Sequence, residues 1–356
     1  MTHDDSVKYP PLYPGTLRRP NDGVQNWYLD LKDWIGLAKA RLGRDAGGYS
    51  ELYPLLLEAT QARNVRVVLS MPLWHEISRV KDPRQREDLA QVVGEITAFE
   101  YLAGAVEVTR LELEESLNVT FGDRVERWGS LPLIGGSLLH AFGRRGGLRI
   151  SGPDGIDLTP QVRRERGEWL ADLERIAEHE LLRGPVDASI SQLRASGYRP
   201  EIAHQRLADN LEFEVDLAAK LIKYPKMKSR IRDVVTARHM SWEISEMLTE
   251  ELGLRHRELS ALGDQEEVRA FMLRMPSARV TIDLKASYHR DAQRRWSVND
   301  LHDIAAMSVA VPYCDVVMAD SEVWSHLTRS KLGQLMSTQL PKTPVHATEI
   351  LRECAG

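Results

Sequence analysis

The chain has 356 residues, of which 42% are hydrophobic and 28% charged, and this length fits one large domain or two ordinary ones. The composition is that of a globular protein with a sizeable core, which excludes a collagen-like or largely disordered chain, and no apolar stretch approaches the roughly 18 residues of a membrane span. The formal net charge of −5 argues against coating nucleic acid through bulk positive charge, but it is compatible with an acidic site beside a basic rim.

Residues 1–23 contain Pro10, Pro11, Pro14 and Pro20 and little periodicity, which predicts an N-terminal extended arm. The same segment lacks a basic region followed by an apolar run, so we expect no secretory signal. Only two cysteines are present, too few for a disulfide framework, and a reducing cytoplasm is the predicted location.

Strand and helix patterns alternate in residues 24–110. Apolar runs predict buried strands at 24–29 and 65–69, with a third short strand at 106–109. Amphipathic patterns predict helices at 34–42, 52–62 and 84–99.

The middle of the chain, residues 111–264, has a mainly helical pattern. A glycine-rich basic loop at 135–155 comes first, and the helices predicted after it are 162–182, 202–224 and 231–252. Strand signals return in residues 265–356, at 316–319 and 345–347, between helices predicted at 266–273, 300–310 and 322–335. This order predicts a parallel α/β domain formed by 24–110 and 265–356 and split by a helical insertion.

Acidic residues follow the predicted strands. Asp30 ends the first strand and Asp320 the last, and Glu76 lies in the helix after the second. Asp300 and Asp303 lie one turn apart on the helix before the last strand. Ligands of parallel sheets bind outside the carboxyl ends of the strands, so we expect these side chains to converge. Unpaired carboxylates share protons or bind cations, and Mg²⁺ and Mn²⁺ prefer such oxygen ligands.

Four segments together resemble the PIN-like nucleases. They are YLD at 28–30, VVLS at 67–70 with PLWHEI at 72–77, NDLHDIAA at 299–306, and PYCDVVMAD at 312–320. The resemblance covers 24–110 and 265–353 and implies a PIN-like three-layer α/β/α fold with a parallel central sheet. The long insertion is not part of a compact PIN core.

The resemblance also implies the site. Its catalytic residues would be Asp30, Glu76, Asp303 and Asp320, and the ligands of Mg²⁺ or Mn²⁺ would be these four together with Asp300. Whether Asp300 or Asp303 is the ligand stays open.

Each candidate also has a structural alternative. Asp30 and Ser70 could cap the helices that follow them, and Glu76 could be an ordinary surface acid. Asn299 could orient a neighbouring carboxylate. Successive helix residues point about 100° apart, so neither His75 nor His302 is expected to face the site.

A run of basic residues precedes the acidic helix: Lys285, His289, Arg290, Arg294 and Arg295. A basic run is usually a solvated surface, but this one lies just before the predicted acidic site, which favours contacts with substrate phosphates. The predicted substrate-binding residues are Arg290, Arg294, Arg295, Ser70 and Asn299. Further candidates are the loop arginines Arg144, Arg145 and Arg149 and the basic stretch at 220–232.

The resemblance implies a metal-dependent nuclease that hydrolyses phosphodiester bonds, most simply an endoribonuclease in which bound ions activate water. RNA is favoured over DNA as the partner because most of the family cuts RNA. The alternatives are a DNA or structure-specific nuclease, for instance in defence, and a non-catalytic PIN-like module that binds nucleic acid or protein. A homodimer and a regulatory protein partner are compatible with the family, and no membrane partner is expected.

Overall fold

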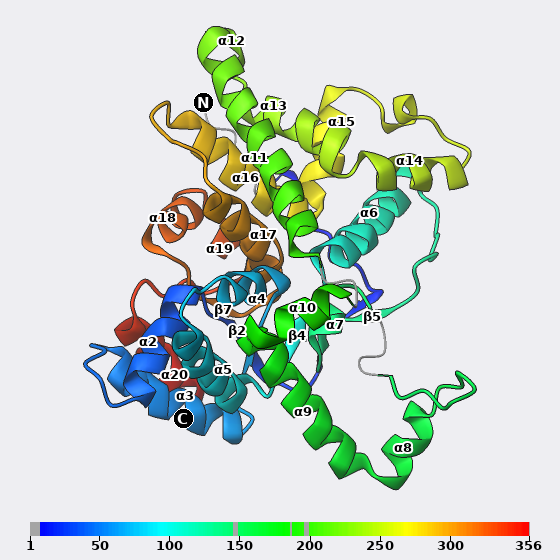
Figure 1. The fold of residues 1–356 in the computed structure, drawn as a ribbon. Helices are drawn as coiled ribbons and strands as arrows, with labels where there is room; N and C mark the ends of the chain where they lie inside the picture. The colour runs from blue at the N-terminus through cyan, green and yellow to red at the C-terminus, as the bar shows by residue number, and fades with distance from the viewer. Residues whose placement is uncertain (1–7, 145–148, 186, 196–198, 356) are drawn as a thin grey trace.

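The computed structural model describes residues 8–144, 149–185, 187–195 and 199–355. Its fold is mixed α/β (Figure 1). It contains a parallel sheet of three short strands in the order β3-β2-β7. These strands are β2 (Gln25–Tyr28), β3 (Val65–Val68) and β7 (Val316–Val317). Most of their side chains are buried, as expected of a parallel sheet covered on both faces. The predicted strands at 24–29, 65–69 and 316–319 are confirmed.

Single bridges extend the sheet at both edges. Leu69 pairs in parallel with Tyr101 of β4 (Tyr101–Leu102), and Val316 pairs in parallel with Gln339. The chain therefore runs outward from β2 through β3 to Tyr101, and then returns to add β7 and Gln339 on the other side. The strand order reverses between β2 and β7, where parallel α/β sheets bind their ligands.

The other two predicted strands are wrong. Residues 106–109 lie in α6 (Ala105–Phe121), and residues 345–347 lie in α20 (Pro344–Ala355). Each segment is the first turn of a longer helix, and its apolar residues divide between a buried and an exposed face, so the short apolar run does not mark a buried strand. Val106 and Val345 are more than half exposed, whereas Val108 and Ala347 are fully buried.

Four helices follow the first strands, and the predictions at 34–42, 52–62 and 84–99 are confirmed in α2, α3 and α5. The bounds are α2 (Leu31–Arg41), α3 (Tyr49–Gln61), α4 (Met71–Ser78) and α5 (Pro83–Thr97). Helices α2, α3 and α5 pack against one another, and α20 packs on α3 (Figure 1). Helix α4 also contacts α2 and α5 but packs mainly against α17 (Val298–Tyr313).

The middle of the chain is mainly helical, as predicted. Its elements are β5 (Leu131–Pro132), β6 (Ile134–Gly135), α7 (Leu138–Ala141), α8 (Thr159–Glu165), α9 (Gly167–Arg183), α10 (Asp187–Ala195), α11 (Pro200–Lys223), α12 (Pro225–Lys228), α13 (Ile231–Arg238), η1 (His239–Glu243), α14 (Ser245–Leu254) and η2 (Leu259–Leu262). The predicted N-terminal arm packs on the fold, because β1 (Leu17–Arg18) pairs with β5. Residues 1–7 of that arm lie outside the described residues.

The last part of the chain supplies α15 (Gln265–Arg274), α16 (Pro276–Arg290), α17, α18 (Ser321–Arg329) and α19 (Leu332–Met336), followed by α20. Helix α16 joins two hydrophobic cores. Val280 and Leu284 belong to the core around the sheet, whereas Ile282 and Ala286 pack in a second core with α6, α11, α13, α14 and α15. Among the described helices, none has both the length and the apolar character needed to cross a bilayer.

Candidate active site

Asp30 and Asp320 follow the two strands between which the strand order reverses. Each is the residue before a helix, Asp30 before α2 and Asp320 before α18. The Asp320 carboxylate accepts a hydrogen bond from the backbone N–H of Val323 at 2.7 Å, whereas Asp30 makes no such side-chain cap. The Asp30 side chain is therefore not required as a helix cap, which was the structural alternative for it.

Glu76 and Asp303 lie on two helices that pack together, α4 and α17. The residues just before them mark the contact, because the rings of His75 and His302 lie 4.9 Å apart. Both carboxylates are half-buried. Among the described residues, neither carboxylate has a hydrogen-bond donor or an ion-pair partner.

The pKa shifts show that the acids interact electrostatically. Burial raises the pKa of Glu76 to about 8, and the charge of Asp30 adds to the shift while Arg79 opposes it. Burial likewise raises the pKa of Asp303 to about 8, with further contributions from the charges of Asp30 and Glu76 and smaller ones from Asp320 and Asp300. The charge of one carboxylate raises the pKa of another only where the two lie close together, so these shifts indicate carboxylates that share one site.

Asp30 belongs to the same electrostatic group. Burial raises its pKa, the backbone N–H of Leu31 opposes that shift, and the charge of Asp320 adds to it. The structure thus brings Asp30, Glu76, Asp303 and Asp320 together at the carboxyl end of the sheet, where the charges of Asp30 and Asp320 raise the pKa of both Glu76 and Asp303.

Asp300, the fifth predicted acid, stabilises the start of its own helix, α17. Its Oδ2 accepts hydrogen bonds from the backbone N–H and the hydroxyl of Ser297, at 2.7 and 3.0 Å, in a capping box. Its Oδ1 forms an ion pair with Arg294. Both oxygens already have donors, so Asp303 is the better candidate to hold a cation.

The predicted substrate-binding residues fall into two groups. Arg290, Arg295 and Asn299 are exposed near the start of α17, so phosphate contacts are open to them. Ser70 is buried, and its Oγ accepts from the backbone N–H of Leu73 at 3.3 Å and lies 2.9 Å from the Tyr28 hydroxyl. Its observed contacts are those of a helix cap.

Arg294 also forms ion pairs and a ring contact with neighbouring side chains. It pairs with Asp300 and Glu322, and its guanidinium lies 3.5 Å from the centre of the Tyr288 ring. These contacts make it a residue that supports α17 and α18.

Two members of the basic run are buried rather than solvated. Lys285 pairs with Glu214 and Glu243, and His289 lies 2.8 Å from Glu214. They join α16 to the insertion and are not part of a phosphate-binding surface. Of the loop arginines, Arg149 pairs with Asp157, and Arg145 lies outside the described residues.

The sequence patterns did not single out two cations near the acids. Lys32 donates a hydrogen bond to the carbonyl oxygen of Ala319 at 2.7 Å, and Arg79 lies within 3.5 Å of His302. Their only signal in the sequence was a position two or three residues from Asp30 and Glu76, which is weak evidence for any helix residue.

No group of three or more His, Cys, Asp or Glu side chains in the described ranges is already arranged to hold a metal ion. The chemistry of the four carboxylates nevertheless fits a hard divalent cation, since all are oxygen donors and their repulsion would fall on binding one. Comparison with protein-family models, with curated proteins and with solved structures gives no match for this chain. Function is therefore inferred from the side chains themselves.

Proposed function

We propose that the protein is a metal-dependent nuclease with a PIN-like core, and that it acts as an endoribonuclease. The observation that carries this proposal is the raised pKa of Asp30, Glu76 and Asp303, to which burial contributes most and the charges of neighbouring acids add. Carboxylates at the carboxyl ends of parallel strands, with no described donors for two of them, suit divalent cations better than any other ligand.

Each acid has a role in this proposal. Asp30, Asp303 and Asp320 would hold Mg²⁺ or Mn²⁺, and Glu76 would position the attacking water. When bound, the cation supplies the activation of water and the stabilisation of the leaving oxygen. The contacts of Asp300 with Ser297 and Arg294 support its assignment as the residue that orients α17.

RNA is the proposed substrate because the resembling family mostly cuts RNA, and DNA is the alternative. The exposed Arg290 and Arg295 are suited to contact the phosphates of either polymer. The same proposal places the protein in the cytoplasm, in keeping with its two free cysteines.

The test is cleavage of labelled single-stranded RNA, single-stranded DNA and flap DNA in Mn²⁺, in Mg²⁺ and in EDTA. Asp30→Asn and Asp320→Asn should each reduce the rate about 100-fold or more, because a lost ligand removes several kcal/mol of transition-state stabilisation. Asp264→Asn is the matched control, since this helix-capping carboxylate belongs to α15 and asparagine caps equally well. Equal rates for all four proteins would refute the proposed site.

A further inference from the structure

Arg79 is an exposed arginine next to the proposed catalytic acids. It directly follows α4 and lies one turn after Glu76. Residues three apart on a helix have Cβ atoms about 5–6 Å apart, so the two side chains are neighbours. Burial raises the pKa of Glu76, and the charge of Arg79 opposes that rise, as expected of side chains that lie close together. The roles proposed for the four acids do not involve this arginine.

Arg79 has no anionic partner within the part of the chain that the structure describes. Its Nη1 lies 3.5 Å from Nε2 of His302 on α17, which is its polar contact there. An imidazole is either neutral or positively charged, so this contact does not compensate the charge of the guanidinium. His75, whose ring lies 4.9 Å from that of His302, does not compensate it either. The guanidinium is therefore positioned between α4 and α17 with its charge available to a ligand.

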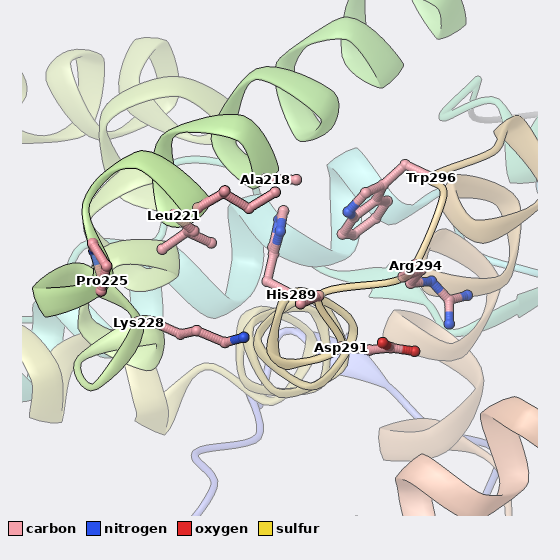
Figure 2. A pocket seen from close by; sticks show the side chains of 10 residues that line it. Ala218, Leu221, Pro225, Lys228, His289, Asp291, Arg294 and Trp296 are labelled. Atoms are coloured by element: carbon pink, nitrogen blue, oxygen red, sulfur yellow. The ribbon is translucent and has the colours of Figure 1, made fainter.

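A second arginine near the acids, Arg294, already has anionic partners. It forms ion pairs with Asp300 and Glu322. Figure 2 shows Arg294 at a pocket of about 310 Å³ between α11 and the segment that joins α16 to α17. A phosphate would have to displace two carboxylates to reach Arg294, whereas it would displace one histidine contact to reach Arg79.

Unsatisfied groups of opposite charge thus lie side by side. The carboxylates of Glu76 and Asp303 lack a described donor, and Arg79 lacks a described anion. A phosphate group of the substrate would fit between them, because its oxygens can face a cation held by the acids on one side and the guanidinium on the other. Arginine suits this place because its planar fork donates two parallel hydrogen bonds to one phosphate group.

We propose that Arg79 binds the phosphate group that is cleaved, donating to its non-bridging oxygens. In the hydrolysis, the oxygen of the attacking water forms a bond to phosphorus while the bond to the leaving sugar oxygen breaks; the water loses one proton and the leaving oxygen gains one. Arg79 keeps its own protons throughout and stabilises the charge that develops on the phosphate oxygens. This inference rests on the proposed nuclease function and adds a substrate-binding residue to it.

The first experiment counts phosphate contacts without cleavage. Fluorescence anisotropy measures the affinity of the full chain for a labelled single-stranded RNA in Ca²⁺ at several KCl concentrations, and a gel verifies that the RNA stays intact. Each phosphate contact with a single strand contributes about 0.7 to the slope of log K against log salt concentration, so Arg79→Met should lower that slope by about 0.7. Arg79→Lys keeps the charge and should retain the slope. An unchanged slope in Arg79→Met would overturn the proposal.

The second experiment measures cleavage in Mn²⁺. Arg79→Met should lower kcat about 100-fold, the loss typical of removing one donor to charge that develops in the transition state. Arg79→Lys should recover part of the rate, since an ammonium group lacks the planar fork. The thermal stabilisation by Mn²⁺ should be at least as large in Arg79→Met as in the wild type. A wild-type rate in Arg79→Met, or a loss of both rate and Mn²⁺ stabilisation, would overturn a phosphate-binding role.

Arg44→Met is the matched control. Arg44 is also exposed and has no ion pair among the residues that the structure describes. It follows the far end of α2, roughly 20 Å along the helix axis from Asp30. This variant should keep the wild-type salt slope and rate. An equal loss in Arg44→Met and Arg79→Met would show an effect of overall charge and overturn the proposed contact.

The two proposals fail in different ways. If Arg79→Met lowers the salt slope but the wild type cleaves no nucleic acid, the nuclease function is wrong and Arg79 contacts a strand that is bound for another purpose. If the wild type cleaves RNA and Arg79→Met matches it in slope and rate, the nuclease stands and the role of Arg79 is wrong. If the wild type neither binds nor cleaves RNA or single-stranded DNA, both proposals are wrong.

Discussion

Nζ of Lys32 donates a hydrogen bond to the carbonyl oxygen of Ala319 at 2.7 Å, and so connects the first turn of α2 to the residue just before Asp320. This contact fixes Asp30 relative to Asp320 across the point where the strand order reverses. The positive charge of Lys32 also opposes the rise in the pKa of Asp30, which burial causes.

Lys32→Met should loosen the two strand ends. We expect the free energy of unfolding to fall by about 1 kcal/mol, because the hydrogen bond is partly exposed, and the cleavage rate to fall about tenfold as the acids lose their spacing. Urea denaturation and a cleavage assay in Mn²⁺ measure the two effects. Lys39→Met, at an exposed position of the same helix, should change neither stability nor rate. Equal behaviour of the two variants would show that Lys32 does not position the acids.

We expect Asp300 to contribute to stability and Asp303 to contribute to cleavage. Asp300→Ala removes a helix cap and one partner of a largely buried ion pair, so the free energy of unfolding should fall by about 2–4 kcal/mol. Its folded molecules should still cleave within about threefold of the wild-type rate. Asp303→Asn should behave oppositely, with unchanged or higher stability and cleavage lowered about 100-fold. The reverse pattern in denaturation and cleavage assays would show that Asp300 holds the cation.

Glu112 should make stability depend on pH. Burial raises its pKa to about 7, although Ser277 and the Tyr313 hydroxyl donate hydrogen bonds to it. An unfolded glutamate titrates near about 4.3, so between that pH and about 7 the folded state alone retains the proton. Unfolding then releases a proton, and this contribution to stability falls as pH rises through the window and is constant above it.

The measurement for Glu112 is urea denaturation across that window. Glu112→Gln should reduce the slope of stability against pH, whereas Glu246→Gln, at an exposed position, should leave the wild-type slope unchanged. Parallel slopes for Glu112→Gln and the wild type would contradict a raised pKa at this position.

Divalent cations should stabilise the folded chain by mass action. At a Mn²⁺ concentration of about 100 times Kd, the free energy of unfolding should rise by about 2.7 kcal/mol. Asp30→Asn and Asp303→Asn should lose most of that gain, while Asp264→Asn should keep it. Thermal denaturation with and without Mn²⁺ tests this; an identical gain in all four proteins would indicate binding elsewhere.

Much of the sheet could be predicted because its strands are short apolar runs bounded by polar residues. Val65–Val68 and Val316–Val317 are such runs. The edges could not be predicted, because Leu69 and Val316 each pair there through one bridge only. Such a bridge leaves no pattern in the sequence. The short apolar runs at 106–109 and 345–347, by contrast, resemble strands although each lies in the first turn of a helix.

The candidate site was predictable to the same extent. The ends of the predicted strands indicated Asp30 and Asp320 as candidates. The helix after the second strand indicated Glu76, and the helix before the last strand indicated Asp303. The capping role of Asp300 was missed although Ser297, three residues before it, gives the spacing of a capping box, whereas its ion pair with Arg294 depends on how the chain turns between the two. Nor could the burial of Lys285 and His289, because their partner Glu214 belongs to the insertion.

The most direct test of the proposed metal site is a crystal of the protein soaked in Mn²⁺, with the ions located by anomalous diffraction. We expect density between the carboxylates of Asp30, Asp303 and Asp320, close to Glu76. The absence of Mn²⁺ at this edge of the sheet under saturating conditions, or its presence only at other carboxylates, would contradict it.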